Sequence, residues 1–333
     1  MRNFEYELAQ RIDDAFAIDG ARTMAIAGGT ELLNWFRLGI AAPDKVIDVG
    51  GLAGLDAIER SHDHLSIGAL ATLNQIGEHA FVREHATALA DACLKAASPQ
   101  IRNRATIGGN VLQKTRCAYF RAEAPLPWGC NKRVPASGCS AREGLNERHA
   151  IFGWTDACVA VHPSDPLVAL AALDAQVEIE SRAGRRTLAI ADLHLTQQEA
   201  AAAGLDAALA ETRLNPGDVI VGYRVPIHAG QRSAYVKVRE RASYEYALVA
   251  AAAVVEIEQG HIVRAAVALG SVAQKPWRLH AAEAQLVGQP PTRDAVLPIL
   301  NAALADARPL EHNGYKVAMA AGAATRAIME AAA

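Results

Sequence analysis

Four of the five cysteines lie between residues 117 and 158, in a part of the chain that has no sustained hydrophobic periodicity. Segment 114–157 is rich in Gly, Pro, Arg and Asn, and a stretch of this length is rarely structureless inside a compact domain unless something orders it. An odd number of cysteines without an export signal argues against a disulfide framework. Four thiolates can instead complete a tetrahedral zinc site or bind a [4Fe–4S] cluster, and without a C-x-x-C pair the spacing does not decide between the two. The four candidates are Cys117, Cys130, Cys139 and Cys158.

The composition is that of a globular protein: 333 residues, of which 51% are hydrophobic and 21% charged, with room for two or three domains. A net charge of −3 argues against a protein that binds nucleic acid, because such proteins usually carry a clear basic excess. The apolar runs stop at about ten residues, whereas a membrane helix needs roughly 20, and the N-terminal residues lack the apolar core of a secretory signal. We therefore expect no membrane span and a cytoplasmic location, unless a signal-bearing partner carries the folded subunit into the periplasm.

Hydrophobic patterns divide the chain into an α/β part and a later part in which strands are followed by helices. A strand at 24–27, a helix with Thr30 as its N-cap and a strand at 45–49 begin an α/β unit. Beyond residue 230, residues 234–239 alternate, and Gln259-Gly260 between two apolar runs predicts a tight hairpin. Helices are expected near 278–287, 295–307 and 315–331. Strands followed by helices predict a separate C-terminal α+β domain.

Two glycine pairs are the first signs of a ligand, in Ala27-Gly28-Gly29-Thr30 and in the segment 106–110. Glycine pairs admit positive φ and let a ligand approach the backbone, so two such turns could hold the two phosphates of a dinucleotide. Two tight structural turns are an equally good explanation of the pattern. Neither turn is a full G-x-G-x-x-G or a P-loop, so neither of those folds is supported.

These segments resemble the FAD-diphosphate loops of the flavoprotein subunits of molybdenum hydroxylases, the xanthine dehydrogenase and carbon monoxide dehydrogenase relatives. Residues 101–110 (Ile-Arg-Asn-Arg-Ala-Thr-Ile-Gly-Gly-Asn), His162-Pro163-Ser164-Asp165-Pro166 and the segment around Lys237 are similar to that family in order and spacing. The resemblance implies an α+β fold. An FAD-binding domain would span 1–225, with two α/β subdomains at about 1–55 and 56–225, and a C-terminal α+β domain with antiparallel strands and helices would span 226–333.

The same resemblance implies a set of FAD contacts. The two turns would wrap the diphosphate and ribityl chain through backbone N–H groups, Asp165 would accept hydrogen bonds from the flavin or its sugar, and Ile220 would touch the adenine side. Lys237 would reach the flavin, where a cation stabilises the reduced form; a solvated strand lysine is the alternative reading. The residues of the turns are Ala27, Gly28, Gly29, Thr30, Glu31, Leu32, Leu33, Thr106, Gly108, Gly109 and Asn110.

Between the second turn and Asp165 the sequence carries a long extra segment, about 114–158. Its Cys-Asn-Lys-Arg, Ser-Gly-Cys and Glu-Arg-His-Ala motifs are similar to the [4Fe–4S] loop of periplasmic aldehyde oxidoreductase flavoprotein subunits. The resemblance therefore favours a [4Fe–4S] cluster over zinc. Cys93 lies at helical spacing from Leu89 and Ala97, and we expect it to be a small buried residue outside the site.

Together these features imply an FAD- and [4Fe–4S]-containing electron-transfer subunit of a molybdenum-dependent aldehyde oxidoreductase. Its partners would be a molybdopterin-binding large subunit, a [2Fe–2S] small subunit and an external electron acceptor. The sequence offers no H-E-x-x-H, no G-x-S-x-G and no defensible pair of catalytic carboxylates. A self-sufficient FAD oxidoreductase and a zinc-stabilised nucleotide-binding assembly module remain as alternatives.

Overall fold

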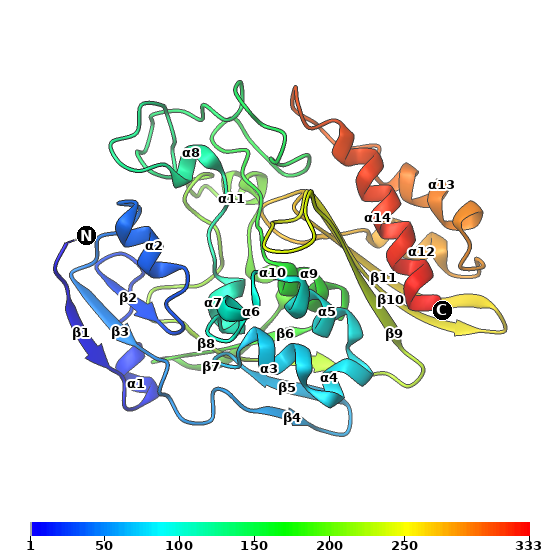
Figure 1. Ribbon diagram of the computed structural model, residues 1–333, viewed down its shortest axis with the longest axis horizontal. Helices are drawn as coiled ribbons and strands as arrows, with labels where there is room; N and C mark the ends of the chain where they lie inside the picture. The colour runs from blue at the N-terminus through cyan, green and yellow to red at the C-terminus, as the bar shows by residue number, and fades with distance from the viewer. Residues whose placement is uncertain (1) are drawn as a thin grey trace.

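The computed structural model describes residues 2–333, which form three sheets with helices packed between and around them (Figure 1). The expected α+β class is confirmed. The first sheet is small and wholly parallel, in the order β1-β3-β2. Its elements are β1 (Glu5–Leu8), α1 (Ile12–Ala15), β2 (Thr23–Ile26), α2 (Leu32–Arg37) and β3 (Lys45–Asp48). Val46 and Ile47 of β3 point to opposite faces, so Val46 packs in the cluster of α2 and Ile47 in that of α1.

One expectation about this sheet is wrong. Thr30 is not the N-cap of the helix that follows β2, because that helix, α2, begins at Leu32 and Glu31 takes the N-cap position. The Glu31 side chain makes no cap hydrogen bond either, since its carboxylate accepts one from Trp35 Nε1 at 2.8 Å and binds two arginines described below.

The second sheet is antiparallel, in the order β4-β5-β8-β6-β7, and it joins segments that are far apart in the chain. Helices α3, α5 and α9 share with β5, β6 and β8 the larger apolar core of the molecule. Its strands are β4 (Ile58–Arg60), β5 (His64–Gly68), β6 (Gln176–Ser181), β7 (Gly184–Ala189) and β8 (Val219–Pro226). The helices around it are α3 (Leu73–Glu78), α4 (Ala80–His85), α5 (Thr87–Lys95), α6 (Pro99–Arg102), α7 (Ile107–Val111), α9 (Asp165–Ala172), α10 (Ile190–Leu193) and α11 (Gln197–Ala202).

The third sheet is an antiparallel meander, in the order β12-β11-β10-β9, and is buried on both faces. Ala250, Ala252 and Val254 pack in the core of α5 and α9, whereas the alternate residues of β10 pack against α14. This double burial explains why β10 reads as a continuous apolar run. The elements are β9 (Arg232–Val238), β10 (Val249–Glu258), β11 (His261–Gly270), β12 (Trp277–Arg278), α12 (His280–Leu286), α13 (Arg293–Ala303) and α14 (Tyr315–Ala332).

The hairpin expected at Gln259-Gly260 is confirmed. Glu258 lies opposite His261, so the loop has two residues, and both have positive φ, 50° and 80°. These angles are those of the tight hairpin turn that suits the twist of the flanking strands.

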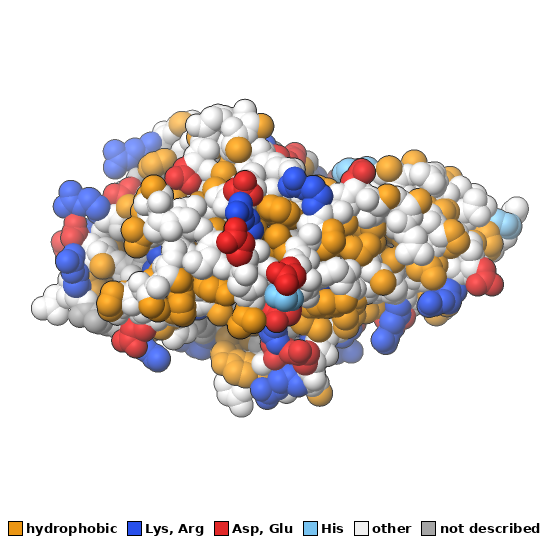
Figure 2. Space-filling model, turned by 90° about the horizontal axis from the view of Figure 1, so that it is seen from above, with side chains coloured by type: hydrophobic (Ala, Val, Ile, Leu, Met, Phe, Trp, Pro, Cys, Tyr) orange, Lys and Arg blue, Asp and Glu red, His pale blue; other side chains and the backbone are white. Residues whose placement is uncertain are grey.

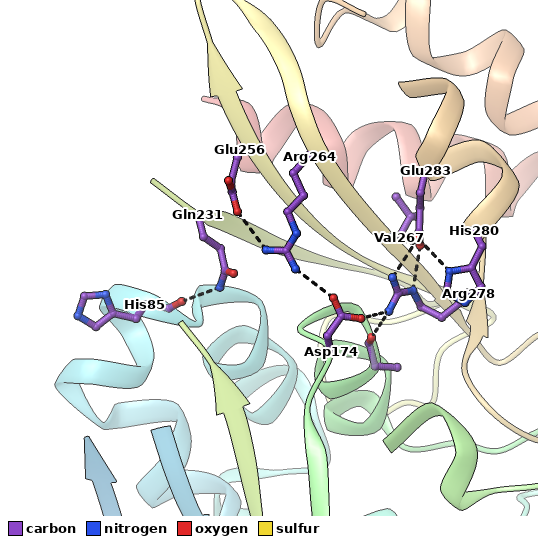
Figure 3. A network of polar contacts seen from close by, with 10 residues as sticks. His85, Asp174, Gln231, Glu256, Arg264, Val267, Arg278, His280 and Glu283 are labelled. Atoms are coloured by element: carbon purple, nitrogen blue, oxygen red, sulfur yellow. Dashed lines mark hydrogen bonds and ion pairs between the residues drawn. The ribbon is translucent and has the colours of Figure 1, made fainter. Parts of the chain in front are cut away.

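A polar network joins the end of α9 to the third sheet (Figure 3). Arg278 donates to Asp174 Oδ1 at 2.6 Å and to the Ala171 carbonyl at 2.7 Å, and Arg264 donates to Asp174 Oδ2 at 3.1 Å. The Arg278 guanidinium also donates two hydrogen bonds to Glu283, from Nε to Oε1 and from Nη2 to Oε2. The C-terminal part is thereby fixed to the helix that begins at Asp165.

The cysteine segment forms the upper part of the molecule in Figure 1, between α2 and the N-terminal end of α14, and contains only the short helix α8 (Ala118–Arg121). Seen from above, the molecule has basic and acidic side chains interspersed with apolar ones (Figure 2). Within residues 2–333, no helix combines the length and apolar character that a membrane span needs.

Candidate functional site

The two glycine turns lie against each other. A Cβ placed on Gly28 would come within 1.8 Å of the Arg104 carbonyl oxygen, just before the second turn. Gly29 has φ +72°, a conformation that L side chains rarely adopt. Two segments about eighty residues apart in sequence therefore meet at one place, as the resemblance implies.

The first turn leaves a run of backbone donors without acceptors. Among the described residues, the N–H groups of Gly28, Gly29, Thr30 and Glu31 donate no hydrogen bond. Successive N–H groups of this kind form a concavity suited to an anion. The side chains that follow have other roles, since Leu32 packs in the core with Trp35 while Leu33 is 45% exposed.

The second turn is bonded mostly within the protein. Thr106 caps α7 by accepting from the Gly109 N–H at 3.2 Å, and the Gly108 N–H donates to the Ala69 carbonyl. A Cβ on Gly108 would crowd Ala69, but one on the exposed Gly109 would meet only the Thr106 hydroxyl, at 3.1 Å. A Cβ at position 109 would therefore press on the Thr106 hydroxyl that caps α7, but it would meet no other atom within 4 Å.

Asn110 and Asp165 are brought together by Ser164. The Ser164 hydroxyl donates to Asn110 Oδ1 at 2.6 Å and also caps α9, whose first residue is Asp165. Ile220 lies in β8 opposite Ile179 and is buried in the larger core. The next residue of β8, Val221, accepts a hydrogen bond from the Ala69 N–H. Ile220 is therefore adjacent in sequence to the residue that binds Ala69, whose carbonyl accepts the Gly108 N–H of the second turn.

Lys237 is not a solvated lysine. Its side chain is 2% exposed, and Nζ donates to Asp165 Oδ2 at 2.7 Å and to the Lys95 carbonyl at 3.1 Å. Tyr235 donates its hydroxyl to the other oxygen of Asp165, and burial followed by the Asp165 charge raises the pKa of this phenol. Asp165 at the start of α9 thus balances a buried ammonium and also lies where a carboxylate stabilises the helix dipole.

The four clustered cysteines line one small pocket, together with Lys132 and His149. An antiparallel bridge pairs Cys130 with Cys139, and a second bridge pairs Cys158 with Thr155. Cys93 lies elsewhere, fully buried in α5. No three His, Cys, Asp or Glu side chains within residues 2–333 are arranged to hold a single metal ion.

Backbone N–H groups near two of the thiols favour their thiolate forms, those of Lys132 and Arg133 at Cys130 and those of Phe120 and Tyr119 at Cys117. The N–H groups of Phe120 and Arg133 donate their hydrogen bonds to the carbonyl oxygens of Cys117 and Cys130. Burial nevertheless raises the pKa of the Cys117 thiol to about 12, so its thiolate requires a compensating cation.

Cys139 has the same surroundings. Burial raises the pKa of its thiol as well. Four thiols that line one pocket fit a metal–sulfur group, which binds thiolates and stabilises their charge.

Two side chains at the cysteine pocket were not foreseen as site residues. His149 Nε2 lies 3.1 Å from Cys117 Sγ, and burial lowers the pKa of this imidazole to about 4. Lys132 is buried beside the same pocket. Both fall within the quoted Cys-Asn-Lys-Arg and Glu-Arg-His-Ala motifs, but only the three-dimensional structure places them at the thiols.

The segment is anchored to the first turn through Glu31. The carboxylate accepts hydrogen bonds from Arg116 Nη2, at 2.8 Å, and from Arg121 Nη2. Burial would raise the pKa of Glu31, but the two guanidinium groups outweigh it and hold this pKa below its usual value. The turn and the cysteine segment therefore share one buried anion.

The segment is anchored on its other side to α14. Lys316, fully buried, donates to the His149 carbonyl at 2.9 Å and to the Ser271 carbonyl at 2.7 Å. Asn313 donates to the carbonyls of His149 and Ala150, both at 3.2 Å. The C-terminal helix thus fixes the residue that contacts Cys117.

Comparisons with known proteins extend over the whole chain. A model of the FAD binding domain in molybdopterin dehydrogenase matches residues 2–228, and a model of the CO dehydrogenase flavoprotein C-terminal domain matches residues 234–331. The aldehyde oxidoreductase FAD-binding subunit PaoB of Escherichia coli (strain K12) is 40% identical over 326 residues, which cover 96% of this chain and 95% of PaoB. The nicotinate dehydrogenase FAD-subunit of Eubacterium barkeri is 27% identical, over 90% of this chain and 86% of its own.

The fold is also similar to a solved structure. Carbon monoxide dehydrogenase from Hydrogenophaga pseudoflava, in a form that lacks the Mo-pyranopterin moiety of its molybdenum cofactor, contains a chain with 27% identity and a TM-score of 0.75. The match covers 99% of this chain and 97% of that one.

The buried Asp165–Lys237 pair leads to a prediction about stability. Lys237→Met leaves the Asp165 carboxylate buried with Tyr235 alone, so we expect the free energy of unfolding to fall by about 3–5 kcal/mol in urea titrations. Lys275→Met is the control, because its pair with Glu199 is more exposed and should cost less than about 1 kcal/mol. Equal losses in the two variants would contradict this reading of the pair.

Proposed function

The chain belongs to the FAD-binding subunits of the molybdopterin dehydrogenases, and we propose that it is the electron-transfer subunit of a molybdenum-dependent aldehyde oxidoreductase. The observation that supports this proposal is a pair of neighbouring sites. The first glycine turn has free backbone N–H donors, and a pocket is lined by four cysteines. Glu31 of the turn connects the two sites through its ion pair with Arg116 of the cysteine segment. The name of the PaoB relative supports an aldehyde as the substrate of the complex. The oxidation itself would take place on a molybdopterin-binding large subunit.

We propose that the two turns, residues 27–33 and 106–110, hold the FAD diphosphate. The free N–H groups of Gly28 to Glu31 support this, as does the open space at Gly109. Asp165, Ile220 and Lys237 would complete the site toward the flavin and the adenine. The Asn110–Ser164 hydrogen bond supports their inclusion, because it joins the second turn to the start of α9.

We propose that Cys117, Cys130, Cys139 and Cys158 hold a [4Fe–4S] cluster. Their shared pocket supports this ligand set, and so does the burial of the pocket, which raises the pKa of three of the thiols and so requires a cation to compensate their thiolates. Four separate thiolates are the usual ligands of such a cluster.

When bound, the flavin exchanges one or two electrons and the cluster exchanges one, so the subunit could connect a [2Fe–2S] small subunit to an external acceptor. The residues of this chain bind and orient the two groups and control the charge around them. In this proposal the FAD-binding domain spans 1–225, with the cysteine insertion at 114–158, and the C-terminal domain spans 226–333.

Gly109 provides the sharper test of the flavin site. In Gly109→Leu the side chain would project into space that the protein leaves open, so we expect the purified variant to lose most of its FAD. Bound flavin is measured by absorbance after release from the protein. Gly29 is less suitable, because its positive φ would strain any substituted backbone.

The matched control is Gly322→Leu, on α14, where a Cβ meets no atom within 4 Å. This variant should keep its flavin. Full flavin retention in Gly109→Leu, with the same secondary structure as the wild type, would count against the placement.

The cysteine assignment predicts a pattern of iron content. Each single Cys→Ser variant at 117, 130, 139 and 158 should lose most of the roughly four irons per chain that a [4Fe–4S] site holds. Cys93→Ser should keep them, because Cys93 lies outside the pocket. Iron and acid-labile sulfide are assayed on the purified full chain. A folded wild type that contains zinc and no iron would overturn the assignment in favour of a structural metal.

A further inference from the structure

A buried lysine lies at the cysteine pocket, and the proposed cluster does not by itself explain it. Resting on that proposed cluster, we propose that Lys132 is a positioning residue for electron transfer: a fixed positive charge, held in place by Glu211, that favours the reduced state of the four-cysteine site and raises its reduction potential.

The geometry holds the Lys132 ammonium in one place. Its side chain is 5% exposed, and Nζ donates to Glu211 Oε1 and to the Ala208 carbonyl, both at 2.6 Å. The side chain lines the same pocket as the thiols of Cys158 and Cys130. An ammonium fixed by two acceptors cannot turn toward solvent as a surface lysine does.

The charges around Glu211 do not cancel. Glu211 binds Lys114 through Oε2 as well as Lys132 through Oε1, and Gln274 Nε2 donates to it at 3.2 Å. Burial would raise the pKa of Glu211, but the two lysines hold it well below its usual value. Two ammonium groups facing one carboxylate leave a net positive charge beside the thiolates.

This charge has a predictable effect on reduction. Taking up one electron adds one negative charge to the four-thiolate site, while Lys132 stays protonated in both states and no proton is transferred. A buried cation stabilises the more negative state, because the interaction is weakly screened away from water. The potentials of iron–sulfur sites are known to respond to net charge and to hydrogen bonds at sulfur.

The same contacts would also exist if Lys132 only cross-linked the segment to residues 208–211. The two roles differ in what they predict for Lys132→Gln, whose amide can still donate to Glu211 but carries no charge. A cross-link would be kept in that variant, whereas a charge effect would be lost; Lys132→Arg would keep both.

The test is a reductive titration of the purified full chain with dithionite, which is oxidised as the cluster gains one electron, followed by electron paramagnetic resonance. We expect Lys132→Met to keep its iron and to shift the one-electron equilibrium at least tenfold toward the oxidised state, which is 59 mV. Lys132→Arg should lie close to the wild type, and Lys132→Gln should shift the equilibrium toward the oxidised state as Lys132→Met does. Arg142→Met is the control, because that cation of the same segment is exposed and paired with Glu143 and Asp156; it should shift the equilibrium less than twofold.

A shift below twofold in Lys132→Met, with the cluster intact, would overturn the inference and leave the proposed function standing. A wild type without any iron–sulfur signal would instead refute the cluster on which both depend. If Lys132→Met cannot hold its cluster, Lys132→Gln decides: a shift toward the oxidised state supports the inference, and an unchanged or opposite shift refutes it.

Discussion

The cysteine segment is held by three buried ionisable side chains supplied by the rest of the protein. Glu31 forms ion pairs with Arg116 and Arg121, and Glu211 forms ion pairs with Lys114 and Lys132. Lys316 donates hydrogen bonds to the carbonyls of His149 and Ser271. The segment has a single short helix, and its larger buried apolar side chains are Phe120, Ile151 and Phe152. Breaking a buried ion pair costs several kcal/mol, so the pairs at Glu31 and Glu211 add substantially to this packing in fixing where the segment lies.

These ion pairs and hydrogen bonds also determine which parts of the protein lie next to the segment. Glu31 belongs to the first glycine turn, so the anion that holds the segment lies beside the free N–H groups proposed to bind FAD. Lys316 and Asn313 belong to the region of α14, so the C-terminal part also supports the cysteine segment. In the proposed function, one chain would hold both cofactor sites and would leave substrate oxidation to a partner subunit.

Local sequence patterns predict most of the helices and strands but not these long-range ion pairs and hydrogen bonds. The sheet strands and the Gln259-Gly260 hairpin follow from periodicity and turn chemistry, which act over a few residues. The Thr30 cap fails because Glu31, engaged by arginines some ninety residues away, occupies the N-cap position. Lys132 and Glu211 are 79 residues apart, and Lys237 and Asp165 are 72 apart, so no local signal pairs them. The family resemblance groups the four cysteines, whereas the burial of Lys237 emerges only from packing.

The central claim is that this chain carries electrons and does not oxidise a substrate itself. The most direct measurement mixes an aldehyde, without oxygen, with the purified full chain or with the assembled complex of all its subunits, and follows the flavin absorbance. The account predicts no flavin bleaching in the chain alone, beyond slow reduction by artificial donors, and rapid bleaching in the complex. Rapid aldehyde-dependent bleaching in the chain alone, with partner subunits shown to be absent, would contradict it and identify a self-sufficient flavoenzyme.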